Sequence, residues 1–443
     1  MARGLQRRAR MLKVLLLIGG IVTATHAHAL QPLEEFLRGA RARGPDNVEA
    51  RALRRQSRAE ATAELGRVLP GVSLQGTYTR NEFDTTLQLP GVGGAPGTTV
   101  TITPRDQLDG TATLDVPLVD LSSWARIAAA RTSARAAATQ EASTDLRVQS
   151  AVAQDYHQLV ANVALVEASR RSLEVARESL RIAESRHEAG AVSPLDVDRA
   201  RAEVERNFQQ LASAELEVAV VARALESATG VTPDVGAGAP LEDDLAEEPP
   251  LERFQPADEQ LPQLAAAIQG RVASEQQARA QRLVLVPRLS GVVTQRWTDA
   301  EGFGGREAWW QAVVGLTWTF DLTTIGNIRA QDAAAEAARA REQRIRLAAR
   351  DDIHDTWAAV RTNIARARSA RVQAEVSARA SERALNRYQV GDAAQLDLLQ
   401  AQRDAFSADA ARIQAYADLV NSRAQLRLAA GESLLGAPGK GPR

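Results

Sequence analysis

The stretch "RHEAGAVSPLDVDRARAE" runs from Arg186 to Glu203, and "RYQVGDAAQLDLLQAQRD" runs from Arg387 to Asp404. In each stretch an arginine precedes a glycine by four residues, and a Leu-Asp pair begins five residues after that glycine. Both stretches lie between long alanine-rich segments with helical periodicity. The chain is therefore predicted to form the same helix–turn–helix twice, at an offset of 201 residues (387 − 186).

This offset extends beyond the two turns. Asp120 corresponds to Asp321, and Gly230 corresponds to Gly431, without an insertion between them. Isolated identities are common in a chain rich in Ala, Leu and Arg, but matching glycines, aspartates and helix ends at one offset are not. We interpret the chain as a duplicated unit.

The first helix of each hairpin is predicted to be very long. Residues 122–188 contain neither Gly nor Pro, and apolar residues between Val152 and Val166 recur at alternating steps of four and three. This is the spacing of a left-handed coiled coil. At 1.5 Å per residue such a helix is ~100 Å long, so it is expected in a tubular bundle or an extended coiled coil.

Four segments before the long helices alternate apolar and polar residues, as strands do. The predicted strands are 70–80 and 109–118 in the first unit, and 287–297 and 309–321 in the second. Strands of about ten residues with this alternation are typical of membrane barrels. Four strands cannot close a barrel alone and an open edge is not tolerated in lipid, so copies are expected to associate. Two copies give eight strands and three give twelve, and both remain open at this point.

The chain begins with features of a secretory signal peptide, predicted over residues 1–29. It has a basic start, a short apolar core at 14–22, and Ala27-His28-Ala29 as a cleavage site. The remaining predicted segments are a first repeat (30–230, with its helical hairpin at 121–230), an acidic linker (231–257), a second repeat (258–435, with its hairpin at 322–431) and a tail (436–443).

Composition excludes several classes of function. The net charge of −1 gives no indication of nucleic-acid binding, and the chain has no cysteine for disulfides or thiol chemistry. The segment "DDIHD" (351–355) is interpreted as a solvated helix face, because no second histidine clusters with it. No catalytic, cofactor-binding or metal-binding residues are assigned, and no enzyme activity is expected.

At this point the sequence resembles the TolC-like outer-membrane efflux protein family. The resemblance rests on the two turn motifs and on "LPGVSLQGTYTR" (69–80) and "VPRLSGVV" (286–293) at the first strand of each unit. It implies a mainly helical fold with a membrane β-barrel: a homotrimer whose 12-stranded barrel takes four strands from each chain and is continued by an α-helical tunnel in the periplasm. It also implies the outer membrane of a Gram-negative bacterium as location, and outer-membrane lipid around the strands.

The same resemblance implies a function. The chain is expected to be the passive exit duct of a tripartite efflux or type I secretion system, opened by a periplasmic adaptor (membrane fusion) protein and an inner-membrane transporter. A periplasmic or secreted coiled-coil scaffold without a channel is the alternative. It accounts for the helices and the signal peptide but not for four amphipathic strands, and membrane fractionation distinguishes the two.

Three groups of site residues follow from the resemblance. At the periplasmic gate, Asp397 matches the family's first inward acidic position, whereas Gln400 occupies the second; a role of Asp397 as a helix N-cap is equally open. The adaptor-docking tips are predicted at Gly190, Ala191, Val192, Ser193, Pro194, Leu195, Gly391, Asp392 and Leu396, although turn geometry alone explains Gly190 and Pro194. An aromatic girdle at the membrane surface is predicted from Tyr78, Trp297, Trp309 and Trp310, with buried tryptophans of a soluble β-sandwich as the alternative.

Overall fold

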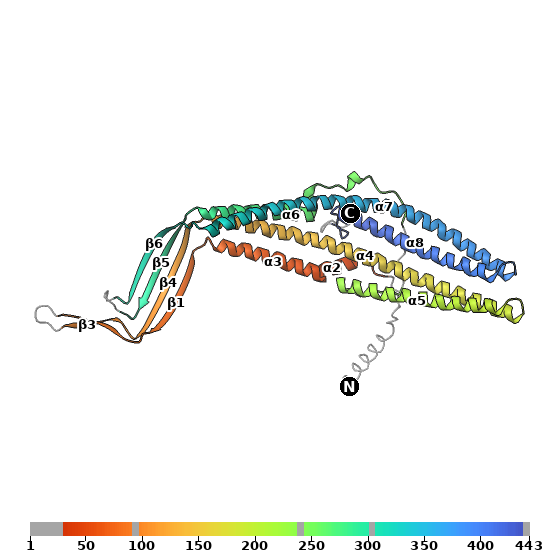
Figure 1. Cartoon of the computed structure of the whole chain (residues 1–443), viewed down its shortest axis with the longest axis horizontal. Coiled ribbons are helices and arrows are strands. Elements are labelled where there is room, and N and C mark those ends of the chain that lie inside the picture. The colour runs from red at the N-terminus through yellow and green to blue at the C-terminus, as the bar shows by residue number, and fades with distance from the viewer. Residues whose placement is uncertain (1–29, 91–96, 237–242, 301–305, 437–443) are drawn as a thin grey trace, which may run out of the picture. The chain divides into compact units, whose positions relative to one another are not determined.

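The computed structural model describes residues 30–90, 97–236, 243–300 and 306–436 (Figure 1). The predicted signal peptide (1–29) and all but the first residue of the predicted tail lie outside these ranges. In chain order the helices and strands are α2 (Leu33–Arg43), α3 (Pro45–Gly66), β1 (Gly71–Arg80), β2 (Thr85–Leu89), β3 (Thr98–Thr103), β4 (Asp106–Val119), α4 (Leu121–Glu188), α5 (Pro194–Thr229), α6 (Pro262–Arg282), β5 (Arg288–Thr298), β6 (Ala308–Thr317), α7 (Leu322–Gln389) and α8 (Gln395–Ala429), with short 3₁₀ turns at Leu251–Phe254, Asp258–Gln260 and Leu283–Leu285.

The chain divides into two compact units, and each takes residues from both sequence repeats. Among the described residues, the first unit comprises those within Ala151–Glu248 and Ala359–Ala424, together with residues 30–40. The second comprises Arg41–Ser150, Pro249–Ala358 and the C-terminal residues from Gln425. The repeat seen in the sequence is therefore not the unit that packs in space.

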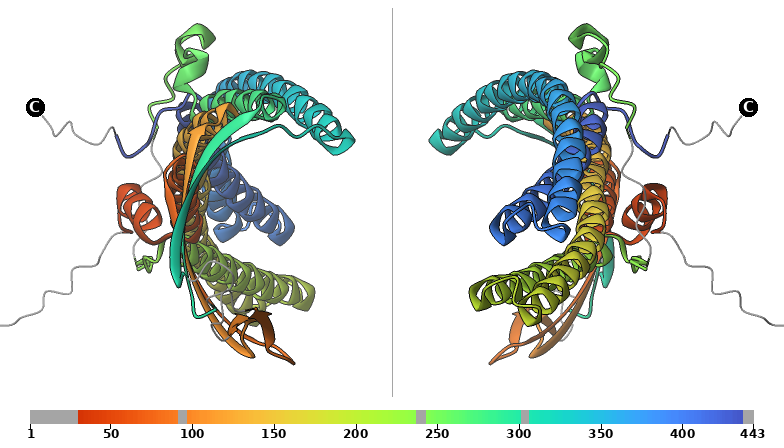
Figure 2. Two further views of the ribbon diagram at one scale, coloured as in Figure 1. Left: turned by 90° about the vertical axis from the view of Figure 1, so that its left-hand side faces the viewer. Right: turned by 90° about the vertical axis from the view of Figure 1, so that its right-hand side faces the viewer.

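The second unit holds the four predicted strands in one antiparallel sheet with the order β1-β4-β5-β6, drawn as a twisted ribbon in Figure 2. This confirms the predicted combination of four strands with long helices. The last strand is shorter than predicted, because β6 ends at Thr317, which pairs with Arg288, the first residue of β5. Beyond it stands Pro287, which has no N–H to donate to the ladder.

The loop expected between the first two strands contains a further hairpin, so that expectation was incomplete. β2 and β3 form a separate two-stranded antiparallel sheet, from Thr86 opposite Thr101 to Leu89 opposite Thr98. The run "TTVTIT" of β3 is rich in β-branched residues, which fit an extended conformation. This local signal was present in the sequence.

Helices α4 and α5 form one helical hairpin, and α7 and α8 form a second (Figures 1 and 2). The turns of both hairpins lie in the first unit. Gly190 and Gly391 have positive φ angles of 73° and 86°, which only glycine adopts without strain. The amide of the residue after each glycine donates back to the carbonyl of Arg186 or Arg387, at 2.8 Å in both turns. This is the Schellman ending of a helix, and it explains the two quoted motifs.

Each long helix begins with an aspartate cap at equivalent positions of the two repeats. The amide of Ser123 donates to Asp120 Oδ1 at 3.0 Å, and the amide of Thr324 donates to Asp321 Oδ1 at 2.6 Å. An aspartate carboxylate satisfies amides of the first turn that have no partner within the helix. The sheet therefore ends and the helix starts in the same way in both repeats.

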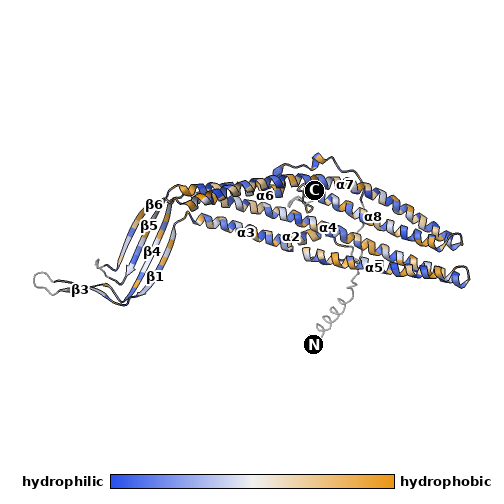
Figure 3. Ribbon diagram, in the orientation of Figure 1, coloured by the Kyte–Doolittle hydropathy of each residue, from blue (hydrophilic) through white to orange (hydrophobic). Residues whose placement is uncertain are grey.

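The long helices mix hydrophilic and hydrophobic residues along their whole length (Figure 3). Across the described ranges, no helix combines the length and the apolar character needed to cross a membrane.

Candidate functional site

The four-stranded sheet has one polar face and one apolar face. The registers place Gln75, Thr111, Thr113, Asp115, Thr294 and Gln311 on the polar face. On the opposite face lie Val72, Leu74, Leu114, Val293, Val314 and Leu316. Several of the apolar side chains are more than two thirds exposed, namely Val72, Leu74, Val314 and Leu316. An exposed apolar sheet face of this extent indicates contact with a partner or a membrane.

Three of the four predicted girdle residues lie on the apolar face. Tyr78 is opposite Leu108, Trp297 is opposite Gly110, and Trp310 is opposite Gln295, all toward the loop ends of the strands. Trp297 covers Gly110, where a Cβ would stand 3.6 Å from the indole ring. These aromatic residues therefore lie on three successive rungs of the apolar face, near the loop ends of the strands.

Trp309 does not belong to that group, and its assignment to the girdle does not fit the register. It pairs with Arg296, whose side chain lies on the polar face. Neighbouring residues of a strand point to opposite faces, so Trp309 and Trp310 cannot both face the same side. The alternation in the sequence already contained this information.

An ion pair crosses the polar face. Arg296 Nη2 of β5 lies 2.8 Å from Asp109 Oδ1 of β4. Sequence reasoning missed this pair, because the two residues are 187 positions apart and only the register of β4 against β5 brings them together. It places opposite charges on the face that also carries Thr111, Thr294 and Gln311.

Large apolar residues also gather where the strands give way to helices. Trp124, Trp318, Phe320 and Leu322 are each about two thirds or more exposed, and Trp318 Nε1 donates to the carbonyl of Leu285 at 3.0 Å. Trp124, near the start of α4, was missed by sequence reasoning. Its signal was a large aromatic residue within an alanine-rich helix.

At the hairpin turns, small and apolar side chains are exposed. Ala191, Leu195 and Leu396 are exposed, and Val390 is 80% exposed although sequence reasoning did not include it. Asp392 instead holds its own turn together, since Arg387 Nε lies 2.9 Å from its carboxylate.

Ser193 and Pro194 have structural roles in the first turn. Pro194 occupies the first turn of α5, and Ser193 is the N-cap of a capping box with Asp196 at the third helical position. The Ser193 hydroxyl bonds Asp196 Oδ2 at 2.8 Å. Part of the predicted docking surface is therefore needed for the turn itself.

The predicted gate residues are exposed on the first two turns of α8. Asp397 is the third residue of α8, so it is not the N-cap; Ala394 stands there, and it has no side-chain oxygen to complete a capping box. Within the described residues, the side chain of Asp397 makes no hydrogen bond or ion pair. Gln400 Nε2 donates to Asp404 Oδ1 at 2.9 Å. Asp404, seven residues after Asp397, is exposed on the same side of the helix and was missed.

The two hairpins contact each other close to their turns. The Arg186 guanidinium lies 4.7 Å from the centre of the Tyr388 ring, and Nη1 donates to the Tyr388 carbonyl. Tyr388 is almost completely buried, and burial raises the pKa of its hydroxyl. The Arg186 guanidinium also lies close to Gly391, where an added Cβ would stand 3.5 Å from Nη2. This cation–π contact joins the ends of α4 and α7.

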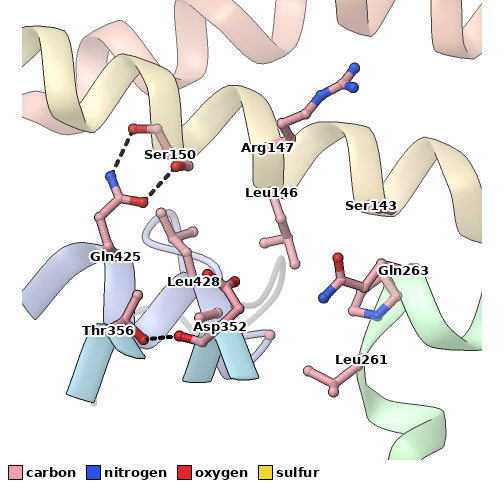
Figure 4. A pocket seen from close by; sticks show the side chains of 13 residues that line it. Ser143, Leu146, Arg147, Ser150, Leu261, Gln263, Asp352, Thr356, Gln425 and Leu428 are labelled. Atoms are coloured by element: carbon pink, nitrogen blue, oxygen red, sulfur yellow. Dashed lines mark hydrogen bonds between the residues drawn. The ribbon is translucent and has the colours of Figure 1, made fainter. Parts of the chain in front are cut away.

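A cavity of about 390 Å³ lies in the second unit among α4, α6, α7 and α8 (Figure 4). Gln425 bonds Ser150 across it, and the Thr356 hydroxyl donates to the Asp352 carbonyl at 2.7 Å. Burial raises the pKa of the Asp352 carboxyl, and Asp355 adds to this. The bond between Gln425 and Ser150 joins α8 to α4 at this helix junction. In the part of the chain that the structure describes, no three His, Asp or Glu side chains are grouped to hold a metal ion.

Comparison with known protein families identifies the fold. The model of the family described as outer membrane efflux protein matches residues 37–231 and 254–432. The chain belongs to this family. It is therefore an outer-membrane channel protein of efflux systems, and its relatives in the family are channels rather than enzymes. No match was found among curated protein sequences.

Solved structures share the fold at low sequence identity. The chain is similar to the outer membrane channel CmeC of Campylobacter jejuni, with a TM-score of 0.78 and 19% identity over 91% of this chain and 86% of that one. It is also similar to the outer membrane protein VceC of Vibrio cholerae, with a TM-score of 0.75 and 17% identity over 90% and 96%. For the open state of the MtrE channel of Neisseria gonorrhoeae the values are 0.71 and 17% over 92% and 90%.

Proposed function

We propose that three copies of this chain form the exit duct of a tripartite efflux or type I secretion system, with one shared barrel in the outer membrane. A periplasmic adaptor and an inner-membrane transporter complete the system. The observation that carries the proposal is the sheet with two unlike faces and two unpaired edges.

The unpaired edges are those of β1 and β6, the outer strands of the sheet. An unpaired backbone group in hydrocarbon costs several kcal/mol, so a sheet in lipid has to close. Pairing β6 of one copy with β1 of the next closes it. Three copies give twelve strands, as the family resemblance implies.

The dimensions of the sheet suit a bilayer. Strands β1 and β6 have ten residues each. At about 3.3 Å per residue and a tilt of about 40°, they span roughly 25 Å, the height of the apolar band of outer-membrane barrels. The apolar face then contacts lipid, with Tyr78, Trp297 and Trp310 at one interface, and the polar face lines a wet conduit.

The hairpin turns are the proposed entrance and docking surface. Three copies supply six turns, and the exposed Ala191, Leu195, Val390 and Leu396 offer an adaptor a small apolar contact at each. Asp397, with Asp404 two turns further along α8, gives the mouth a negative lining that favours cations. Because Gln400 rather than an acidic residue occupies the second family position, the negative charge of that lining is weaker than two neighbouring acidic residues would make it.

The test is to purify the full chain from outer membranes and reconstitute it in planar bilayers. A detergent-dependent trimer that conducts ions supports the proposal. A water-soluble single-chain species that conducts nothing would contradict it and would favour the coiled-coil scaffold.

A further inference from the structure

Another cavity lies in the first unit, where the two helical hairpins meet. Its volume is about 340 Å³, and residues of α4, α5 and α8 line it. Helix α5 contributes Glu203 and Arg206 to the lining, and α8 contributes Arg403. Pockets of about 300–1,000 Å³ are the size that holds small ligands. The cavity is therefore large enough for a small organic molecule.

The ionised side chains that line this cavity carry a net positive charge. Among the described lining residues, the two arginines Arg206 and Arg403 stand against the single carboxylate of Glu203. Two positive charges against one negative charge leave one positive charge over. Because charges attract each other more strongly inside a protein than in bulk water, this excess favours an anion as the ligand.

The Glu203 carboxylate is held in place by four side-chain N–H groups. Its Oε2 accepts from Arg403 Nε at 2.9 Å and from Nη2 at 2.5 Å, and Arg206 Nη1 lies 3.3 Å from the same oxygen. Its Oε1 lies 3.4 Å from Asn207 Nδ2. The Ser172 hydroxyl of α4 donates to Asn207 Oδ1 at 2.7 Å, which fixes the asparagine. These bonds hold both guanidinium groups at the cavity before any ligand binds.

Several donors at the cavity have no partner within the described residues. They are Nε and Nη2 of Arg206, Nη1 of Arg403 and the side-chain amide of Gln210. A guanidinium with two free N–H groups on one edge binds a carboxylate through two parallel hydrogen bonds. Phe406 and Ala410 of α8 line the same cavity and offer apolar contact. The cavity therefore combines a carboxylate site with a place for an apolar group.

We propose that this cavity binds a small organic carboxylate, with its charged group on Arg206 and its apolar part beside Phe406. The inference goes beyond the exit duct, because a single chain supplies every residue of the cavity. Arg206 belongs to the first hairpin and Phe406 to the second, so a bound molecule contacts both. Binding to the folded chain therefore stabilises the arrangement in which the two hairpins touch.

Benzoate serves as the probe, and isothermal titration calorimetry of the protein purified in a non-ionic detergent measures its binding. We expect saturable binding of benzoate and no binding of benzyl alcohol, which has the same ring without the charge. Arg206→Gln is expected to weaken benzoate binding about tenfold or more, because it removes charge-assisted hydrogen bonds. Ala410→Trp fills the cavity, leaves both arginines in place and should abolish binding.

The matched control is Arg181→Gln, and thermal unfolding verifies that each variant is folded. Arg181 pairs with Glu178 at the same three-residue spacing as Arg206 with Glu203, but it does not line the cavity. Its affinity for benzoate should equal that of the parent. Parental affinity in Arg206→Gln or in Ala410→Trp would overturn the proposal, as would equal binding of benzyl alcohol or no benzoate binding by the parent. Loss of the trimer by native mass, with benzoate binding retained, would overturn the exit duct alone.

Discussion

Arg403 Nη2 of α8 lies 2.5 Å from Oε2 of Glu203 of α5, which joins the second helices of the two hairpins. The Glu203 side chain is only 5% exposed, and it also meets Arg206 one turn away at 3.3 Å. Asn207 Nδ2 donates to Glu203 Oε1 at 3.4 Å. A nearly buried carboxylate is tolerated only with such partners.

Replacement of Arg403 by alanine is expected to destabilise the hairpins by about 2 kcal/mol. Loss of one partner from a fully buried pair costs about 3–5 kcal/mol, and the partial exposure of Arg403 reduces this. Denaturant unfolding of the detergent-purified protein measures the change. Arg206→Ala, which removes a more exposed partner of the same carboxylate, is the control and should cost less than about 1 kcal/mol. Equal effects of the two variants would contradict the special role of Arg403.

Adjacent valines of β6 test the assignment of the two sheet faces. Val314 lies on the apolar face and Val313 on the polar face. Val314→Arg is expected to cost about 2–4 kcal/mol per chain and to deplete the protein from outer membranes, because a charge in mid-bilayer is expensive. Val313→Arg places the same charge one residue away in the conduit and should assemble normally. Quantitative immunoblotting of membrane fractions compares them, and the reverse order would refute the assignment.

The acidic residues of α8 are expected to govern ion selectivity. Asp397→Asn and Asp404→Asn should each lower the preference for cations, measured as the reversal potential across a salt gradient in planar bilayers. The control is Asp196→Asn, at the position of the first hairpin that corresponds to Asp397. Because Asp196 belongs to the capping box, its loss should cost about 1 kcal/mol of stability and leave selectivity unchanged. Unaltered reversal potentials in both α8 variants would exclude the negative lining.

Docking at the turns is tested at Ala191, which has no capping role. Ala191→Arg is expected to abolish export in cells, since a bulky charge at each first turn blocks a small apolar contact. Trimer content and conductance of the purified channel should stay as in the parent. Export at the parental level would remove Ala191 from the docking surface.

Acid is expected to weaken the first unit through His157. Burial lowers the pKa of its imidazole from the ordinary value of 6.5, while its hydrogen bonds with the Asn421 side chain and the Ala153 backbone oppose this. Above pH 6.5 the ring is neutral in the folded and unfolded chains, so the stability does not depend on it. Below that pH the unfolded chain binds the proton first, and stability falls by up to about 1.4 kcal/mol per pH unit until the folded pKa is reached.

Thermal unfolding of the parent and of His157→Gln between pH 7.5 and pH 5 measures this dependence. The variant should lose part of the decline seen in the parent. Parallel pH profiles would show that other groups account for it.

Much of the fold was predictable because its signals are local. Glycines that end helices, a Pro194 that starts one, and alternation along the strands act within a few residues, so the hairpin turns were found from the sequence. The β2–β3 hairpin was not predicted because the sequence between its two strands is rich in Gly and Pro, which is typical of a loop. The girdle assignment of Trp309 overlooked the alternation with Trp310.

The site was less predictable because its contacts are long-range. Arg296 with Asp109, Arg403 with Glu203 and Arg186 with Tyr388 each join residues that are far apart in the chain. The sequence around each of these residues gives no indication of its distant partner. The structure was also needed to find that Asp397 does not cap α8. It places the start of α8 at Gln395, so the N-cap position falls on Ala394, which has no side-chain oxygen.

The sequence by itself determined the duplication, the long helices, their turns and the alternation of the strands, since each depends on residue types at fixed short spacings. Only the tertiary structure decided the strand order β1-β4-β5-β6, the face on which each residue lies across the sheet, and which helices of the two repeats touch. Those features depend on register between distant segments, where a shift of one residue exchanges the two faces of a strand.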